Sequence, residues 1–333
     1  MIFAHTIMVV LGFNNTISPE FNFLFGSFLG RPCAAPVFMF CMGAGVVYSR
    51  HSQWDAMVKR GVKLFLLGIL VNVFEFFIPH FLCGALLGSW DIFPIAGGLL
   101  LFCVDILSFA GLTFIFLGIL KKFEISNKWL IVIAIVMSLI GTFTRGIDFG
   151  MPVLNLFFAK FIGCAGGFGA FPLFNWFIFP VAGYVRGQYF IGAKDKGIFF
   201  KFWPLCIIVA FVYFILSSQV LGGGILSNDV HLYYFMTTLD AMFCILFVHG
   251  IFGLCYNLTK WLPDKIINLF SILSSNINTI YIVQWLFIPV GIILLVYLVK
   301  GIVLTDLIAA VFSIFIVALS TVFAVYYKKS ITV

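Results

Sequence analysis

The sequence predicts an all-α, polytopic integral membrane protein with about ten transmembrane helices and both termini in the cytoplasm. Of the 333 residues, 63% are hydrophobic and 9% are charged, whereas a soluble domain is roughly 45–50% apolar and about 25% charged. The apolar residues form runs that approach the roughly 20 residues needed to span a bilayer. Short basic turns separate these runs.

Residues 36–72 set the orientation of the whole chain. They consist of two apolar runs flanking a turn that contains Arg50, Lys59, Arg60 and Lys63. Lys and Arg are retained on the cytoplasmic side of a membrane, so this turn is expected to lie inside. The direction of every other span follows from it.

Ten spans follow in order along the chain. We expect them at Ile2–Phe13, Cys33–Ser49, Gly61–Phe81, Leu99–Leu120, Trp129–Phe143, Phe171–Tyr189, Phe202–Leu221, Tyr234–Leu258, Ser274–Val299 and Ile302–Tyr327. The first run would reach only ~18 Å across a hydrocarbon core of ~30 Å. We therefore expect its helix to start upstream, with an N-terminal portion missing from the sequence.

The loops between spans differ in composition. A Gly- and Pro-rich loop is expected at Cys83–Gly98. The irregular stretch Thr144–Ala170 is expected to hold a short re-entrant or interfacial helix.

The charge distribution agrees with this topology. Fifteen of the 19 Lys and Arg residues fall in the turns predicted to be cytoplasmic, and the opposite loops hold Arg31, Arg145, Lys160 and Lys300. The net charge of +7 therefore indicates orientation in a membrane rather than a nucleic-acid partner. The 8 cysteines are scattered through apolar runs, which favours buried free thiols over disulfides or metal ligands.

Ionisable residues inside predicted spans are candidates for function, because charge is costly in a bilayer. His5 is expected about nine residues, or ~14 Å, from the outer end of its helix, near mid-membrane. Three acids are expected toward the outside, and together with His5 they predict a polar cavity that opens outward. They are Glu75, Asp105 and Asp240, and a second histidine, His249, is expected deeper.

Each candidate has a structural alternative. His5 could be a neutral ring bonded to a neighbouring helix carbonyl, and Glu75 could reach the interface near His80. Asp240 could cap its helix after Thr237 and Thr238.

The other candidates also have plainer interpretations. Gln284, like Asn278, could hold helices together. Lys59, Arg60 and Lys63 could be orientation signals alone, or could bind a phosphate-bearing donor.

Six segments carry a resemblance to a known family. They read FAHTIMVV, AAPVFMFCMGAG, KRGVKLFLLGILVN, DILSFAGLTFIFLGIL, FPLFNWFIFPVAGYVRGQYF and NTIYIVQWLFIP. In this order they resemble the membrane acyltransferase superfamily, which includes the acyltransferase-3 proteins and the bacterial relatives of heparan-α-glucosaminide N-acetyltransferase.

The resemblance implies a fold and a reaction. Residues 1–333 would form a single transmembrane acyltransferase-like domain in a bacterial cytoplasmic membrane, with the lipid bilayer as its surroundings and a homodimer left open. The donor would be cytosolic acyl-CoA, with acetyl-CoA expected, and no metal would take part. The acceptor would be a sugar or an envelope polymer at the outer side.

The resemblance also implies site residues. His5 matches the family's histidine and would act as general base or carry the acyl group, while Asp105 would orient it or bind acceptor hydroxyls. The family's arginine, about ten residues earlier, would precede Met1. Gln284 stands near a position where relatives often show histidine. The pyrophosphate of the acyl-CoA donor would bind to Lys59, Arg60 and Arg186. The binding site of the acceptor would be lined by Glu75, Asp240 and Gln284.

Two other classes compete with the enzyme. A secondary transporter would use the same buried acids to bind a substrate or to couple to protons. A non-catalytic membrane partner is the other class, and the absence of the family's arginine is consistent with it. Labelling of the protein or of an acceptor by radioactive acetyl-CoA would favour the enzyme, whereas substrate uptake into liposomes without labelling would favour transport.

Overall fold

The computed structural model of the chain is predominantly helical, and it describes residues 1–93, 101–164, 169–220, 224–227 and 229–331. Within these residues the named strands are two-residue segments, β1 (Asn15–Thr16) and β2 (Leu304–Thr305). Six helices are long and apolar enough to cross a membrane. They are Trp54–Leu87, Asn127–Thr144, Ile198–Gln219, Thr238–Leu258, Ile277–Leu298 and Asp306–Tyr326. The prediction of an all-α polytopic membrane protein is confirmed.

The four remaining predicted spans correspond to shorter helices. These are α1 (Ile2–Val10, 9 residues), α3 (Ala35–Tyr48, 14 residues), α6 (Ile106–Lys122, 17 residues) and α10 (Ile178–Gly192, 15 residues). A helix of 9 residues rises only about 14 Å. The number of ten spans therefore stays a prediction.

Contacts divide the chain into two compact units. The first unit comprises Met1–Gly30, Val71–Leu101 and Asn257–Val333, and the second comprises Arg31–Leu70 and Phe102–Tyr256. Each unit is assembled from segments that are far apart in the sequence. The packing inside each unit therefore decides which side chains meet.

One continuous helical segment contains the boundary between the units. It runs through α4 (Trp54–Asn72), the π-helix η2 (Val73–Phe77) and α5 (Ile78–Leu87). Its 34 residues would extend about 51 Å, well beyond a ~30 Å hydrocarbon core. The loop expected from Cys83 is wrong at its start, because the helix continues to Leu87 and ends at Gly88 in a left-handed conformation (φ 66°).

The first unit holds α1 between three other elements. Helix α1 packs against the π-helix η1 (Asn22–Phe28), α15 (Ile277–Leu298) and α16 (Asp306–Ile331). The rings of Phe3 and Phe25 stack with their centroids 4.8 Å apart. Buried aliphatic residues of α1, α15 and α16 form one apolar cluster in this unit.

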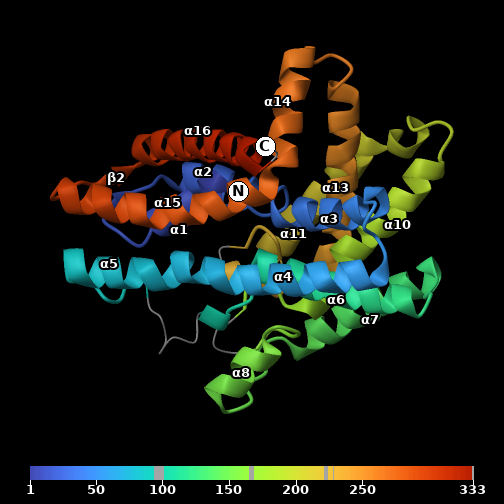
Figure 1. The fold of residues 1–333 in the computed structure, drawn as a ribbon, viewed down its shortest axis with the longest axis horizontal. Helices are drawn as coiled ribbons and strands as arrows, with labels where there is room; N and C mark the ends of the chain where they lie inside the picture. Colours follow the sequence, from blue (N-terminus) through green and yellow to red (C-terminus); the bar gives the residue numbers. More distant parts are fainter. Residues whose placement is uncertain (94–100, 165–168, 221–223, 228, 332–333) are drawn as a thin grey trace. The chain divides into compact units, whose positions relative to one another are not determined.

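Two contacts fix the loop after α1 to the start of α16. Strand β1 pairs in parallel with β2, with Asn15 opposite Leu304 and Thr16 opposite Thr305. Before α2 (Pro19–Phe21), Ser18 donates its N–H to Asp306 Oδ1 at 2.9 Å and its hydroxyl to Asp306 Oδ2 at 2.6 Å. The end of α1 thus lies beside the beginning of α16 (Figure 1).

The second unit is built around a close crossing of α3 and α10. A Cβ atom on Gly43 would collide with the Pro180 carbonyl, and one on Gly183 would collide with the Phe40 carbonyl. Backbones approach this closely only where side chains are absent, as is common between membrane helices.

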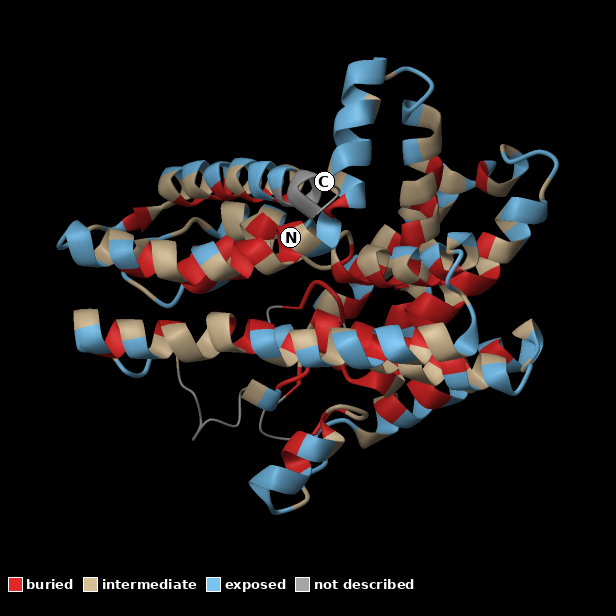
Figure 2. Cartoon of the chain, in the orientation of Figure 1, coloured by how far each residue is buried: buried red, intermediate tan, exposed pale blue. Residues whose placement is uncertain are grey.

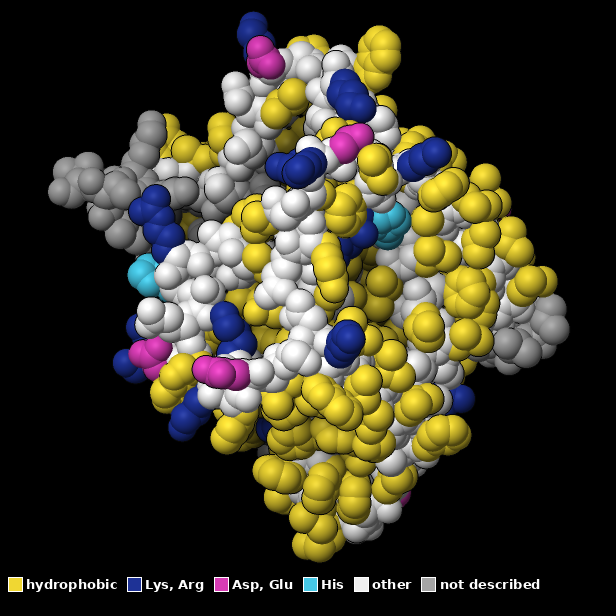
Figure 3. All heavy atoms as spheres, turned by 90° about the vertical axis from the view of Figure 1, so that its right-hand side faces the viewer, with side chains coloured by type: hydrophobic (Ala, Val, Ile, Leu, Met, Phe, Trp, Pro, Cys, Tyr) yellow, Lys and Arg dark blue, Asp and Glu magenta, His cyan; other side chains and the backbone are white. Residues whose placement is uncertain are grey.

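The basic turns of the second unit lie at one end (Figure 1). Lys121 at the end of α6 donates to the Ser52 carbonyl before α4. Asn127, which begins α7 (Asn127–Thr144), donates to Gln188 Oε1 on α10 at 2.6 Å. Figure 3 shows Lys and Arg side chains on the face onto which these turns open. For the turns after the second, fourth and sixth predicted spans, this arrangement agrees with the predicted grouping of basic turns on one side.

Exposed apolar side chains mark the surfaces that would face lipid. On α4, Leu66 and Leu70 are exposed, and on α16 so are Leu307, Val311 and Ile314. Figure 2 shows α16 with exposed residues along one side and buried residues along the other. A hydrocarbon solvent removes the penalty that water would impose on such surfaces.

Three predicted helix boundaries need correction. The fourth span was expected to include Asp105, but α6 begins at Ile106 and Asp105 is its extended N-cap residue, while residues 99 and 100 lie outside the described residues. The sixth span is divided into α9 (Leu173–Trp176) and α10. The eighth starts at Thr238, because the short α12 (Val230–Tyr234) is separate from α13 (Thr238–Leu258).

Two further helices lie between the predicted spans. The expected helix within Thr144–Ala170 is α8 (Pro152–Phe158). Helix α14 (Asp264–Ser275) precedes α15 and has no buried residue. The remaining helical elements are η4 (Ile198–Phe200) and α11 (Trp203–Val220).

The Ser18–Asp306 contact gives a test of how the first unit is held together. Asp306→Ala removes two hydrogen bonds to a carboxylate, and such bonds contribute about 1.5–3 kcal/mol each when both partners stay ordered. We expect a loss of at least about 3 kcal/mol in unfolding free energy, seen as a lower apparent Tm in detergent.

Asp264→Ala is the matched control for this variant. Asp264 also lies in the first turn of its helix, α14, so both variants lose the same favourable interaction with the helix N-terminus. Equal Tm values for the two variants would contradict a stabilising role for the Ser18 contact.

Candidate functional site

His5 meets three side chains of α15 in the first unit. Its ring stacks on Trp285 with centroids 4.4 Å apart and an interplanar angle of 24°. Gln284 donates its Nε2–H to His5 Nδ1 at 3.0 Å. Tyr281 presents its ring edge-on at 6.2 Å. His5 as a residue is partly buried, and these contacts hold its imidazole against α15.

The α15 sequence explains why these side chains converge. Positions 281, 284 and 285 are separated by three and four residues, which places them on one face of a helix. Tyr281, Gln284 and Trp285 are all almost fully buried. The structure therefore brings His5 and Gln284 together, although 279 positions separate them in the sequence.

Buried polar atoms without hydrogen-bond partners lie in the same three helices. Among the described side chains, these atoms include Thr6 Oγ1, Gln284 Oε1 and Trp285 Nε1, together with Ser313 Oγ and Ser320 Oγ of α16. Buried polar groups nearly always have a partner, and each exception needs an explanation. Next to an imidazole, atoms of this kind can serve a polar substrate.

Glu75 belongs to the same unit and lies on a π-helix. It is 6% exposed, and η2, which carries it, packs against α15. A second π-helix, η1, packs against α1. Short π-helical turns inside α-helices are rare and occur frequently at functional sites. The two helices that meet at His5 thus each pack against a π-helix.

The other predicted site residues belong to the second unit. Asp105 is partly buried and starts α6. Its strand-like segment is held by a bridge between Val104 and Gly169 and by Lys160 Nζ, which donates to the Phe102 carbonyl at 2.9 Å. Burial lowers the pKa of the Lys160 ammonium. The structure thus brings a lysine that lies 55 positions further along the sequence to the segment that precedes Asp105.

Asp240 forms a capping box at the start of α13. Its Oδ2 accepts from the Thr237 N–H at 3.0 Å and from the Thr237 hydroxyl at 2.7 Å, and its own N–H donates to Thr237 Oγ1 at 3.1 Å. Tyr213 donates its hydroxyl to Oδ1 at 2.9 Å. Both carboxylate oxygens therefore already have partners, which favours the capping alternative over substrate binding.

The three candidate donor-binding residues differ in setting. Lys59 is 78% exposed and lies 3.9 Å from Asp55, a type of pair that is strongly screened by solvent. Arg60 is exposed and lies over the Phe114 ring at 4.7 Å. Arg186 is partly buried.

Arg186 is the most elaborately positioned of the three. Its guanidinium lies 5.0 Å from the Phe199 ring and 5.4 Å from the Phe200 ring, and it donates to the Phe199 carbonyl at 3.4 Å. Phe200, the second of these two rings, also stacks on the imidazole of His249, with the ring centroids 5.8 Å apart. A cation beside aromatic rings can hold a phosphate and a flat heterocycle.

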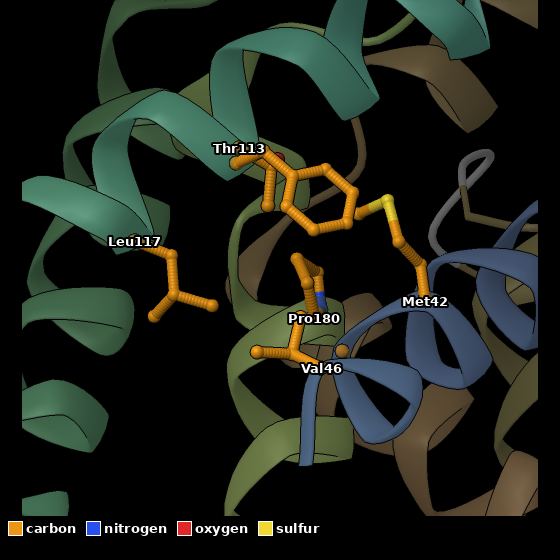
Figure 4. A pocket seen from close by; sticks show the side chains of 7 residues that line it. Met42, Val46, Thr113, Leu117 and Pro180 are labelled. Atoms are coloured by element: carbon orange, nitrogen blue, oxygen red, sulfur yellow. The ribbon is translucent and has the colours of Figure 1, made fainter. Parts of the chain in front are cut away.

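A separate pocket in the second unit is apolar. It lies between α3, α6 and α10, is partly open to its surroundings, and contains about 150 Å³ of space between atoms; its lining residues are Met42, Gly43, Val46, Thr113, Phe114, Leu117 and Pro180 (Figure 4). Its lining has no acid, base or nucleophile other than the Thr113 hydroxyl. This pocket therefore offers no group for proton transfer at neutral pH.

Sequence reasoning missed Trp285 as a contact of His5. The segment NTIYIVQWLFIP was noted for its likeness to a family motif, and its helical spacing would have placed Tyr281, Gln284 and Trp285 on one face. No pattern in the sequence shows which helix this face meets.

Comparison with known proteins supports the resemblance seen in the sequence. A family model described as heparan-alpha-glucosaminide N-acetyltransferase, catalytic, matches residues 1–221. No curated protein and no solved structure matches the chain. The matched residues include His5 and Arg186, while α15 lies beyond them. Of the two branches that the sequence resembles, the match is to this one rather than to the acyltransferase-3 proteins.

The match covers more than half of the 333 residues, and the helices around it are those of an integral membrane protein. The chain therefore belongs to the heparan-alpha-glucosaminide N-acetyltransferase catalytic family and is a membrane-bound acetyltransferase.

Proposed function

We propose that this protein transfers an acetyl group from cytosolic acetyl-CoA across the membrane to an amine or hydroxyl of a sugar or cell-envelope acceptor. The family name supports a glucosaminide amine as the first acceptor to try. The observation that carries the proposal is the imidazole of His5, which Gln284 and Trp285 hold within an otherwise apolar helix bundle.

The proposed chemistry needs one base. The acceptor nitrogen or oxygen attacks the thioester carbonyl while His5 takes its proton, and the carbon–sulfur bond then breaks. The thiolate of coenzyme A leaves and takes the proton back from the imidazole, so the enzyme returns unchanged. Buried polar donors such as Trp285 Nε1 would stabilise the oxyanion of the intermediate.

The donor would bind at the basic end of the second unit. Its phosphates carry negative charge that Arg186 and Arg60 can neutralise, and Phe199 and Phe200 offer faces for the adenine ring. Lys59 would contribute mainly to the long-range electrostatic attraction of the phosphates, because it is exposed and paired with Asp55. Partly buried arginines bind phosphate more strongly than exposed lysines do.

Two acidic residues, Glu75 and Asp105, would bind the acceptor. Glu75 is buried on η2 in the same unit as His5, and Asp105 lies at the opposite end of α6 from the basic residues Lys121 and Lys122. Both are proposed to bind acceptor hydroxyls at the outer side. A bacterial cytoplasmic membrane would give the enzyme both a cytosolic donor and an envelope acceptor.

Removing the His5 imidazole tests the role of this residue directly. His5→Phe keeps a ring that can stack on Trp285 but has no basic nitrogen. General-base catalysis contributes about 10²–10⁴ in rate, so we expect acetyl transfer to glucosamine to fall at least about 100-fold. Thiol release from acetyl-CoA by purified protein measures this rate.

His51→Ala is the control, because this histidine is exposed in the turn between α3 and α4 and should not affect turnover. Yield in the membrane and apparent Tm should stay normal for both variants. A His5→Phe protein with wild-type turnover would remove His5 from the mechanism.

Arg186→Ala tests the donor site. A charge-assisted hydrogen bond to phosphate contributes about 1.5–3 kcal/mol, so KM for acetyl-CoA should rise roughly 10- to 100-fold. At saturating donor, kcat should change little. Arg50→Ala removes an exposed arginine of the α3–α4 turn and serves as the control for the general positive field. Equal KM values for the two variants would argue against donor binding at Arg186.

A further inference from the structure

Gln284 has an unusual set of partners. Its side chain is fully buried (0% exposed). Its Nε2 donates to His5 Nδ1 at 3.0 Å, while its Oε1 has no hydrogen-bond partner. An amide oxygen left without a partner in an apolar bundle costs free energy, so another role for this amide has to be considered.

The group that donates a hydrogen bond to Nδ1 fixes the tautomer of the imidazole. An amide NH2 group only donates, so Nδ1 must offer its lone pair, and a neutral ring then carries its proton on Nε2. Such a ring can donate a proton from Nε2 but cannot accept one there. In this orientation His5 is not ready to act as a base through its other nitrogen.

A 180° rotation of the Gln284 side-chain amide exchanges its oxygen and nitrogen and so reverses the tautomer that it favours. Oε1 would then accept a hydrogen bond from Nδ1–H, and the Nε2 lone pair would be free to take a proton. Each orientation leaves one amide atom without a partner, so neither is strongly favoured over the other. The stack on Trp285 holds the plane of the imidazole, and the hydrogen bond with the Gln284 amide keeps Nδ1 toward α15.

We infer that Gln284 is the positioning residue that sets the tautomer of His5, and that rotation of its amide makes His5 competent as a base. The inference rests on the proposed function and deepens it. In the base-competent orientation, Nε2 takes the proton of the acceptor amine or hydroxyl as the new bond to the acetyl carbon forms. Nδ1–H stays bonded to Oε1 throughout, and Nε2 returns the proton to the departing thiolate.

Two variants separate tautomer control from packing. Gln284→Glu has the same shape, and its carboxylate can only accept from Nδ1–H, which locks the base-competent tautomer. Gln284→Leu fills similar space and makes no hydrogen bond. Acetyl transfer from acetyl-CoA to glucosamine by the purified full-length protein measures kcat and KM for each variant.

We expect kcat of Gln284→Leu to fall about 100-fold, because a misoriented catalytic group costs about that much, with KM for acetyl-CoA unchanged. Gln284→Glu should keep kcat within about tenfold of wild type, since the orienting hydrogen bond is kept. Asn278→Leu changes an exposed polar residue of the same helix and is the control for polarity loss on α15. Apparent Tm values establish that each variant is folded.

Each other result overturns the inference. Wild-type kcat in Gln284→Leu would show that His5 needs no orienting bond. Equal loss in the Leu and Glu variants would assign Gln284 a packing role instead. In both of these cases, a large loss in His5→Phe would leave the proposed function standing. Full turnover in His5→Phe, or none in the wild type, would overturn the proposed function and this inference together.

Discussion

An imidazole in a hydrocarbon environment needs a hydrogen-bond partner, and here α15 supplies it across 279 positions of sequence. Burying a polar group without a partner is costly, and in a membrane no water is available to compensate. The contact of His5 with Gln284 and Trp285 therefore ties the first helix of the chain to one of its last. The rest of the first unit can be understood as the framework that preserves this contact.

The framework is necessary because α1 is short. A helix of 9 residues is too short to be stable by itself, so neighbouring elements must hold it. The β1–β2 pairing, the Ser18–Asp306 bonds and the Phe3–Phe25 stack act on three different parts of the α1–η1 segment. Together they leave α1 little freedom, which is what a catalytic side chain requires.

The sequence predicts the membrane fold and the candidate residues better than it predicts their contacts. Composition alone predicted an all-α membrane protein, and His5 and Gln284 were both candidates. Their meeting could not be predicted, because α15 is apolar on nearly every side and its sequence does not mark the face that packs on α1. The π-helices η1 and η2 also have no sequence signature, since they depend on local packing rather than on residue type.

The helix ends in the structure differ from the predicted ones for physical reasons. The third span was expected to end at Phe81, yet the helix continues to Leu87 and tolerates Pro79, which sits in the first turn of α5 directly after the wider turn of η2. Thr237 and Asp240 form the cap that their spacing indicated. Helix α14 escaped notice because its 12 residues are amphipathic and shorter than a span.

The account depends on the acetyl thioester reaching His5. The most direct measurement is the rate at which diethylpyrocarbonate modifies His5, followed by mass spectrometry of the peptide that contains it, with and without saturating acetyl-CoA. The account predicts that acetyl-CoA slows modification of His5 and leaves that of the exposed His51 unchanged. Equal rates at His5 in the two conditions would contradict it.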